Sequence, residues 1–374
     1  MVNVLIINDW VSNLVAGGTY RVQGFAKGFS SLGFKVFITT PWRVIEYRKH
    51  VKMHQPNIGS PLYYATTGLM LPLQVVKSLA KSGSIDLVLI QMPSPFTKAL
   101  SILPILKLFN TPLVFDFGDP WWKKTDPTLY KYISNKLIQL QVRESMLISS
   151  SSKLILKFIN NRNKVWIPNG IDDELFKVRS IKQYNSSLVG FLGAFTKRSA
   201  PELIIPMLSE LIRRGVDVRF ILIGGGDSLP IIREEAIKKG LNRRILFTGN
   251  VPRHRIPELL SMCNVLVAPY KELPELHFIF PTKVPEMMAL KKPVITARLY
   301  EIVTTFKIGE EVLVAKYDAT DYAKKLIMLI NNDHLRNKIA ENGYVRVSRD
   351  LTWKKLVLKI LESLKNLGGS AKLT

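Results

Sequence analysis

Short apolar runs alternate along almost the whole chain with segments whose apolar residues recur at helical spacing. The runs include VNVLIIND and IDLVLIQ in the first half, and SLVGFLG, RFILIGG and NVLVAPY in the second. This alternation predicts an α/β protein with parallel sheets, rather than an all-helical or all-strand one. The sequence contains no repeat of fixed period, which argues against a solenoid.

The chain has 374 residues, enough for about two domains with separate cores. The best boundary is VRSIKQYNSS, a polar stretch without apolar periodicity. We therefore predict a first domain over residues 1–177, a linker over 178–187 and a second domain over 188–351. The last segment, 352–374, contains LTWKKLVLKILESL, whose apolar spacing with intervening lysines predicts an amphipathic helix.

The formal net charge of +24 is the strongest compositional feature, and the sequence pI is about 10.0. Such a protein attracts polyanions, so nucleic acid, anionic lipid and phosphorylated substrates are candidate partners. The excess of positive charge is evenly divided between the two halves of the chain, so it does not indicate which half would bind a polyanion. Two basic segments with interleaved apolar residues, 42–55 and 153–164, suit a membrane surface; they equally fit solvated faces of packed elements.

Three further observations concern the cellular compartment. The single cysteine, Cys263, excludes an intrachain disulfide and suits a reducing compartment. The N-terminal MVNVLIINDW lacks a basic leader and reads as a first strand, not a signal peptide. No run reaches the roughly 18 to 20 apolar residues that span a bilayer. We therefore predict a cytoplasmic protein, soluble or peripheral at the inner face of the membrane.

The segment FPTKVPEMMALKKPVITA, residues 280–297, carries the most informative candidate chemistry. Thr282 is a candidate N-cap and Pro285 suits the first helical turn, so a helix is predicted to begin near Lys283. Its free N–H groups and the cation of Lys283 favour a phosphate. Glu286, in the first turn, can accept two hydrogen bonds from a ribose diol. Phosphate and ribose together indicate a nucleotide.

The same segment also fits a capped core helix. In that interpretation the apolar residues from Met287 to Leu290 pack inward, and Lys283 and Glu286 are solvated charges at the helix start.

Glycines supply a second group of candidates. Gly17 and Gly18 follow the first strand and precede a helix, and Gly225 lies in the loop GGGD. Such loops let the backbone approach a ligand and offer N–H groups to phosphate or a sugar hydroxyl, although a strand-to-helix turn also has structural uses. The run GGGDSLP lacks the spaced glycines of the dinucleotide fingerprint, which argues against a dehydrogenase.

In order and spacing, these segments resemble the GT-B glycosyltransferases that use nucleotide sugars, specifically the large retaining family 4, or group 1 glycosyltransferases. The resemblance runs from Val2 to about Leu364. It implies a GT-B fold of two Rossmann-like parallel-sheet domains facing a central cleft. The first would bind the acceptor and the second the nucleotide sugar, and the C-terminal helix would cross back to the first domain.

The resemblance also suggests which residues hold the donor diphosphate. After SLVGFLG, which ends at Gly193, the family places an arginine where this chain has Ala194. Lys197 and Arg198 are the nearest cations, and two surface charges in a loop are the alternative. Together with Lys283 they would stabilise the leaving diphosphate without a metal.

The base and the donor sugar correspond less well to the family pattern. Relatives hold the base through backbone groups at the position of Val251 and Pro252, so the base identity is not readable. The family's first glutamate falls on Phe278 here, and Glu275 or His277 could substitute for it. Backbone groups on the approach to the helix remain available at Phe280, Pro281 and Thr282. Of these three residues, Phe280 and Thr282 carry an N–H.

On the acceptor side, FDFGDPWW places Asp116 and Asp119 just after a strand, on a loop expected to face the cleft. Asp119 is the candidate that contacts the acceptor hydroxyl or orients the sugar. An Asp-Pro turn explains the same residue structurally. Trp121 and Trp122 suit stacking on a sugar, a membrane interface or core packing.

Together with the candidate residues, the resemblance implies a metal-independent retaining hexosyltransferase without a cofactor. It would move a sugar from a nucleoside diphosphate to a glycan or lipid-linked glycan, at or near an anionic membrane surface and without specific nucleic acid. The alternative is a basic nucleic-acid-binding protein, or a non-catalytic membrane-surface protein, on a GT-B-like fold.

Overall fold

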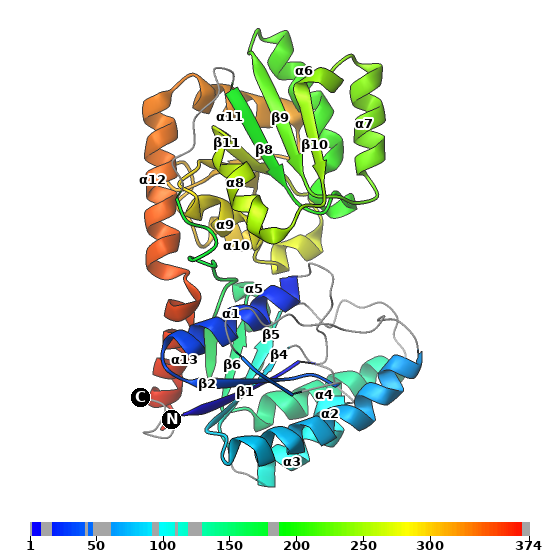
Figure 1. The fold of residues 1–374 in the computed structure, drawn as a ribbon, viewed down its shortest axis with the longest axis vertical. Coiled ribbons are helices and arrows are strands. Elements are labelled where there is room, and N and C mark those ends of the chain that lie inside the picture. Colours follow the sequence, from blue (N-terminus) through cyan, green and yellow to red (C-terminus); the bar gives the residue numbers. More distant parts are fainter. Residues whose placement is uncertain are drawn as a thin grey trace. The chain divides into compact units, whose positions relative to one another are not determined.

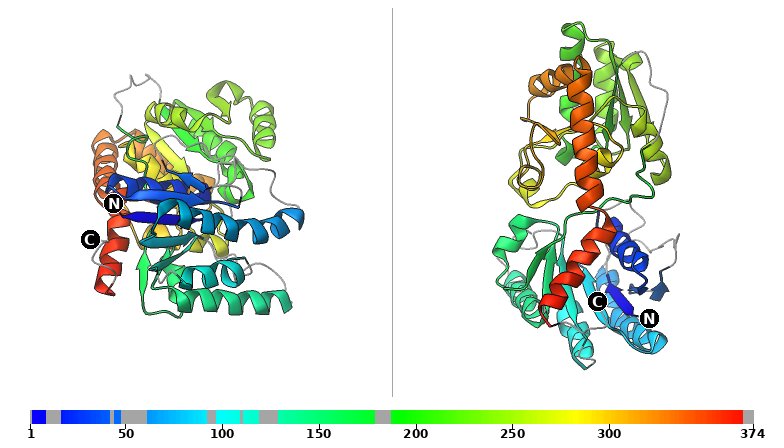
Figure 2. Two further views of the ribbon diagram at one scale, coloured as in Figure 1. Left: turned by 60° about the horizontal axis from the view of Figure 1, so that its bottom comes forward. Right: turned by 90° about the vertical axis from the view of Figure 1, so that its left-hand side faces the viewer.

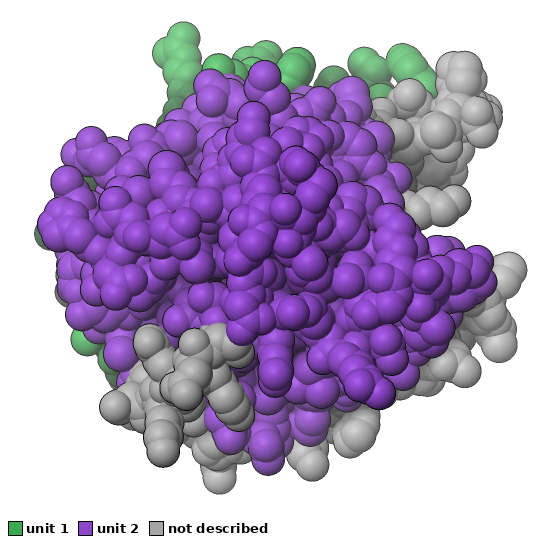
Figure 3. Space-filling view, turned by 90° about the horizontal axis from the view of Figure 1, so that it is seen from above, with its two compact units in different colours: residues 1–170, 353–374 green, residues 171–352 purple. Residues whose placement is uncertain are grey.

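The computed structural model describes residues 2–8, 17–41, 44–47, 61–91, 97–108, 111–118, 129–178 and 187–368. The chain divides into two compact units, each with its own sheet (Figure 1). Unit 1 combines residues 1–170 with 353–374, and unit 2 comprises residues 171–352 (Figure 3). Residues of the predicted linker from 179 to 186 lie outside the described part.

Unit 1 contains a seven-stranded sheet of order β3-β2-β1-β4-β5-β6-β7, parallel except for the edge strand β3. β1, β4 and β5 are buried along their whole length, as expected for strands covered on both faces. The strands are β1 (Asn3–Ile7), β2 (Lys35–Thr39), β3 (Val44–Glu46), β4 (Leu87–Gln91), β5 (Leu113–Phe117), β6 (Leu147–Ser150) and β7 (Lys164–Trp166).

Right-handed crossovers place the helices of unit 1 in two layers. The β1-to-β2 connection runs one way along the sheet and carries α1, whereas later connections run the other way and carry helices on the opposite face. α1 packs on the C-terminal helix α13. The helices are α1 (Gly17–Ser31), α2 (Pro61–Ser82), the π-helix η1 (Thr97–Ile102), α3 (Leu103–Leu108), α4 (Leu129–Glu144), α5 (Lys153–Phe158) and α13 (Trp353–Asn366).

The predicted C-terminal amphipathic helix is confirmed as α13, which buries its apolar face in unit 1. Trp353, at its start, lies against α1 with its ring edge-on to Phe25 at 5.2 Å between centroids. A Cβ atom at Gly24 would lie 1.9 Å from the indole, so only glycine permits this approach.

A buried ionic cluster in unit 1 corrects the expectation for Asp116. This residue is not on a loop; it lies within β5, fully buried, and accepts hydrogen bonds from Arg21 Nη2 at 2.6 Å and Nε at 2.7 Å. Ser149 Oγ donates to the same carboxylate at 2.7 Å, and Arg21 also donates to the carbonyl of Ile167 at 2.8 Å. Asp116 therefore orders α1, β5 and β6 relative to one another.

Unit 2 contains a six-stranded parallel sheet of order β10-β9-β8-β11-β12-β13. Its strands are β8 (Ser187–Leu192), β9 (Val218–Ile223), β10 (Ile245–Gly249), β11 (Val265–Ala268), β12 (Val294–Ala297) and β13 (Leu313–Ala315). The helices are α6 (Ile204–Arg213), α7 (Leu229–Lys238), α8 (Ile256–Ser261), α9 (Lys283–Ala289), α10 (Tyr300–Val303), α11 (Ala319–Ile330) and α12 (Asp333–Asp350).

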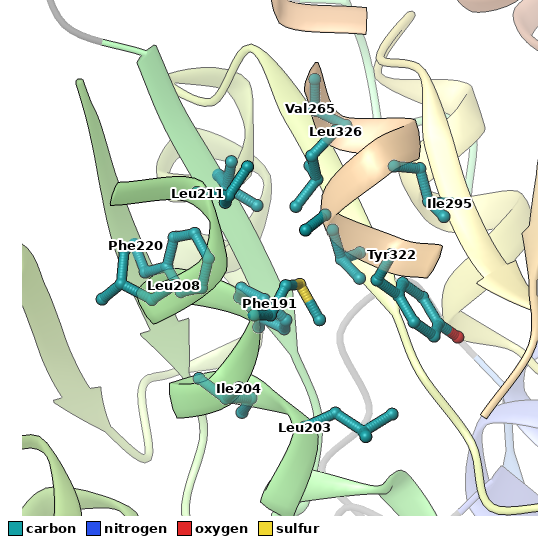
Figure 4. Close-up of a cluster of buried hydrophobic side chains, with 14 of the residues drawn as sticks. Phe191, Leu203, Ile204, Leu208, Leu211, Phe220, Val265, Ile295, Tyr322 and Leu326 are labelled. Atoms are coloured by element: carbon teal, nitrogen blue, oxygen red, sulfur yellow. The ribbon is translucent and has the colours of Figure 1, made fainter. Parts of the chain in front are cut away.

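The core of unit 2 lies between this sheet and the paired helices α6 and α11 (Figure 4). Phe191 and Phe220 meet there with ring centroids 5.0 Å apart, and Leu208 and Leu211 of α6 face Leu326 of α11. With two mainly parallel sheets, each in its own unit, the predicted α/β class with two Rossmann-like domains is confirmed.

Candidate functional site

The candidate site lies in unit 2, at the point where the strand order reverses. β8 pairs with β9 on one side and β11 on the other. The chain runs from β8 to β9 and β10 in one direction along the sheet, then returns to the other side of β8 for β11, β12 and β13. Such a switch point opens a crevice beyond the carboxyl ends of the strands, where open α/β sheets bind ligands. Gly193 follows β8 at this edge, and Tyr270 lies two residues after β11.

Two backbone loops meet at this edge. Gly193 N donates to Ile223 O at 3.0 Å, and Phe195 N donates to Gly225 O at 2.8 Å. A Cβ atom at Gly224, whose φ is 124°, would lie 2.1 Å from the carbonyl oxygen of Gly193. The glycine loop is therefore closed by backbone contacts that any side chain would break.

The predicted helix is confirmed as α9, which begins at Lys283 and has Pro285 in its first turn. Thr282 occupies the N-cap position, but its backbone is already helical and its side chain makes no capping hydrogen bond. The expected side-chain cap is therefore wrong. α9 has only seven residues. The unit positive charge at its start is therefore that of the Lys283 ammonium, and not a charge of the helix dipole.

Lys283 lies close to the edge of the sheet where Gly193 follows β8, which we call the glycine edge. Its ammonium Nζ lies 4.5 Å from the ring centroid of Tyr270 and 3.2 Å from the position that a Cβ atom of Gly193 would occupy. Burial lowers the pKa of Lys283 to about 8, because a desolvated ammonium is less stable. A phosphate at this edge would supply the missing counter-charge.

Glu286 is 3% exposed, so the solvated-charge interpretation is wrong for this residue. Its Oε1 accepts a hydrogen bond from Arg253 Nη2, and the guanidinium lies 5.3 Å from the ring centroid of Phe176. Burial raises the pKa of Glu286, the charge of Arg253 opposes this rise, and the negative charge of Asp172 adds to it. Sequence reasoning missed Arg253, although a cation directly after Val251 and Pro252 was its signal.

Val251 and Pro252 line a shallow surface pocket of about 410 Å³, together with Thr248, His254, Arg255 and Leu259. The pocket adjoins Arg253 in the chain, and Arg253 contacts Glu286. Arg253, whose two chain neighbours both line this pocket, therefore connects it to the Glu286 carboxylate.

Known proteins share this fold and part of the sequence. The family model described as glycosyl transferases group 1 matches residues 172–346. Sucrose-phosphate synthase from Thermosynechococcus elongatus superposes with a TM-score of 0.73 at 16% identity, covering 98% of this chain and 99% of its own. Anabaena Alr3699/HepE in complex with UDP superposes with a TM-score of 0.69 at 16% identity, covering 98% of this chain and 100% of its own.

The chain has the GT-B fold of glycosyltransferases. Among curated sequences, the uncharacterized glycosyltransferase MJ1178 of Methanocaldococcus jannaschii is 25% identical over 94% of this chain and 96% of its own. The Staphylococcus aureus capsular polysaccharide biosynthesis glycosyltransferase CapM is 25% identical over 63% of this chain and 64% of its own.

The structure shows the surroundings of Phe280, Pro281 and His277. Phe280 is fully buried, 6.2 Å from Phe306 between ring centroids, so its side chain belongs to the core. Pro281 O accepts a hydrogen bond from Val284 N at 3.3 Å. His277 Nδ1 accepts a hydrogen bond from Tyr300 N at the start of α10, at 3.1 Å.

Lys197 and Arg198 form the 3-10 helix η3 (Lys197–Ser199) on the loop after Gly193. Arg198 has an exposed side chain, and its carbonyl accepts from Lys271 N at 3.1 Å. The structure describes the backbone of Lys197 but not its side chain.

In unit 1, Gly17 and Gly18 form the first turn of α1 rather than a loop before it. Asp119, Trp121 and Trp122 lie outside the described residues, as does most of the basic segment 42–55. Within the described ranges there is no cluster of three or more metal-ligating side chains. In the same ranges, no helix is long and apolar enough to cross a membrane.

Proposed function

We propose that this protein is a retaining glycosyltransferase that moves a sugar from a nucleoside diphosphate to a glycan or lipid-linked glycan acceptor. One observation carries the proposal: α9 places the Lys283 ammonium beside Gly193 and a buried Glu286 carboxylate one turn further on. A cation next to a backbone loop suits a diphosphate, and a carboxylate near it suits a ribose diol.

Relatives support the nature of the donor. The HepE structures contain UDP, UDP with glucose, and UDP-glucose. CapM, by its name, acts in capsular polysaccharide biosynthesis. A uridine nucleotide is therefore the first donor to test, and a growing polysaccharide the first acceptor class.

In the proposed reaction, the bond between the anomeric carbon and the diphosphate oxygen breaks. The acceptor oxygen bonds to that carbon on the same face, and its proton passes to the departing phosphate. Negative charge develops on the leaving oxygen, and fixed cations stabilise it. Lys283 takes this role with Lys197 and Arg198, and the proposed chemistry needs no metal.

The proposed division of labour assigns the acceptor to the N-terminal domain, residues 1–177, where Asp119 would orient the acceptor hydroxyl. Residues 188–351 would bind the donor through the groups around α9. Lipid-linked acceptors lie at the membrane surface, so a peripheral position at the inner face is part of the proposal.

Calorimetric titration with UDP, GDP and ADP tests the donor site. We expect micromolar binding of one of them, weakened at least about tenfold in Glu286→Ala, since the ribose loses hydrogen bonds to a charged acceptor. Glu286→Gln preserves the shape and should weaken binding as well. Glu234→Ala, an exposed glutamate on α7, is the matched control. A folded protein that binds none of the three nucleotides contradicts the proposal.

A second test uses the pKa of about 8 at Lys283. Below pH 8 the Lys283 ammonium is charged and can pair with a phosphate. Above pH 8 the amine is largely neutral, so it must take up a proton when the phosphate binds. UDP affinity should therefore fall between pH 8 and pH 9, by up to about tenfold. The phosphate of UDP, with a pKa near about 6, does not titrate in this window.

Lys283→Met is the control for this titration. It should bind UDP weakly at every pH and show no decline between pH 8 and pH 9. A decline of the same size in Lys283→Met would assign the titration to another group.

A further inference from the structure

One face of unit 1 combines exposed cations with exposed large apolar side chains. α2, η1, α3 and α4 lie side by side on one side of the seven-stranded sheet, and η1 contacts α2, α3 and α4 (Figures 1 and 2). We call the outer surface of these four helices the α2–α4 face.

The α2–α4 face is strongly cationic. Its helices contain seven lysines and arginines and one acid, Glu144. That acid is bridged by Lys107 at 2.7 Å and Arg143 at 3.0 Å. Between Glu46 and Asp116 the sequence has a single acid, Asp86, which accepts a hydrogen bond from Asn3 N. The exposed cations are Lys77, Lys81, Lys107, Lys136 and Arg143.

Large apolar side chains are exposed between these cations. Leu73 on α2 is 56% exposed, Leu108 at the end of α3 is 84% exposed, and Tyr132 on α4 is 63% exposed. Val76, Leu100 and Ile133 are also exposed on the same helices. Exposed apolar side chains that gather on one surface mark an interaction site.

A groove extends this surface. It lies between α4 and the segment after α5, has a volume of about 820 Å³, and is lined partly by Ile138, Val142 and Phe158. Phe158 is 63% exposed at its edge. The basic segment 153–164 thus adjoins α4, to which Asn161 Nδ2 is tied by a hydrogen bond to Val142 O at 3.0 Å.

We propose that the α2–α4 face binds the surface of an anionic lipid bilayer. Lysines along the face attract anionic headgroups, and Leu73, Val76 and Leu108 gain from entering the boundary between headgroups and acyl chains. Nucleic acid would use the cations but offers nothing to exposed aliphatic side chains. The proposal rests on unit 1 alone and does not depend on the proposed glycosyl transfer.

Flotation with vesicles of phosphatidylcholine and phosphatidylglycerol in equal parts tests this proposal at low salt, with pure phosphatidylcholine vesicles as the reference. The wild-type protein should float with the anionic vesicles and remain behind with the neutral ones. Lys81→Ala combined with Lys136→Ala should weaken binding by about fivefold per removed cation. Leu73→Ser combined with Leu108→Ser should also reduce binding, because these side chains no longer enter the apolar part of the bilayer. Salt does not screen this contribution, so the loss should be the same at low and high salt.

Matched controls separate the face from net charge and general hydrophobicity. Lys354→Ala with Lys365→Ala removes two exposed cations from α13 in the same unit, and Ile231→Ser with Ile237→Ser removes two exposed apolar residues from α7. Both pairs should leave flotation unchanged. Equal losses in the controls, or no binding of wild-type protein to anionic vesicles, would overturn the proposal.

Two parallel measurements make the result unambiguous. If the α2–α4 face variants lose binding of duplex RNA while vesicle binding persists, the face is a nucleic-acid site and the proposal fails. UDP affinity should be equal in all these variants, so failure of the donor site and failure of membrane binding are read separately.

Discussion

Arg253→Ala is expected to make UDP binding weaken more steeply than in the wild-type protein as the pH falls. The Glu286 carboxylate is buried, and Arg253 is the cation that opposes the rise of its pKa caused by burial and by Asp172. Without the guanidinium, the pKa of Glu286 should rise further, and the protonated carboxyl group no longer accepts two hydrogen bonds from the ribose diol. Affinity should then fall by about tenfold for each pH unit below the raised pKa.

Other groups near Glu286 do not give the same expectation. The strands β11 and β12, which pack against α9, carry no titratable side chain. α12 contributes Glu341, which is bridged to Lys291 beyond the end of α9, and Lys283 lies on α9 itself. Arg253 is therefore the cation whose removal should raise the pKa of Glu286 further.

Three controls accompany this titration of UDP from pH 5 to pH 8. Lys238→Ala removes an exposed cation on α7 that pairs with Glu234, and it should follow the wild-type profile, including titration of the UDP phosphate. Arg253→Lys keeps the charge and should restore part of the affinity. A 2′,3′-dideoxy analogue of UDP lacks the diol and should bind equally to wild type and Arg253→Ala. A wild-type profile in Arg253→Ala would show that Arg253 does not position Glu286.

Arg21→Met should destabilise unit 1 by about 3 to 5 kcal/mol, the cost of leaving one partner of a buried ion pair uncompensated. Asp116 is fully buried and would keep only Ser149 among the three hydrogen bonds described above. All six tryptophans belong to unit 1, so tryptophan fluorescence during urea unfolding reports on this unit.

Two variants check the origin of this loss. Arg213→Met removes an exposed arginine of unit 2 and should change the free energy of unfolding by no more than about 0.5 kcal/mol. Arg21→Met combined with Asp116→Leu removes both charges and should recover much of the stability. If the double variant is no more stable than the single one, the loss comes from packing around Arg21 and not from the unpaired carboxylate.

The sequence by itself determined the architecture, because each element is specified locally. The apolar runs that became β1, β4 and β8 are short and flanked by amphipathic segments, so alternation alone indicates parallel sheets. The start of α9 at Lys283 followed from Pro285, whose fixed φ and missing N–H suit a first turn.

The partners of the charged residues could not be read from the sequence. Glu286 and Arg253 are 33 residues apart, and Arg21 and Asp116 are 95 residues apart. Asp116 therefore resembled a loop residue after a strand, and Arg253 resembled a surface cation near a backbone site. The failed expectation of a Thr282 side-chain cap has the same origin, because the backbone of Thr282 is already helical.

What the chain determined alone was the set of helices and strands, since periodicity and turn residues act over a few positions. Only the tertiary structure decided which charges are buried together, which lysine reaches the glycine edge, and which helices share an exposed cationic face. Those relations depend on crossovers that bring distant segments of one sheet side by side, and no local pattern in the sequence encodes them.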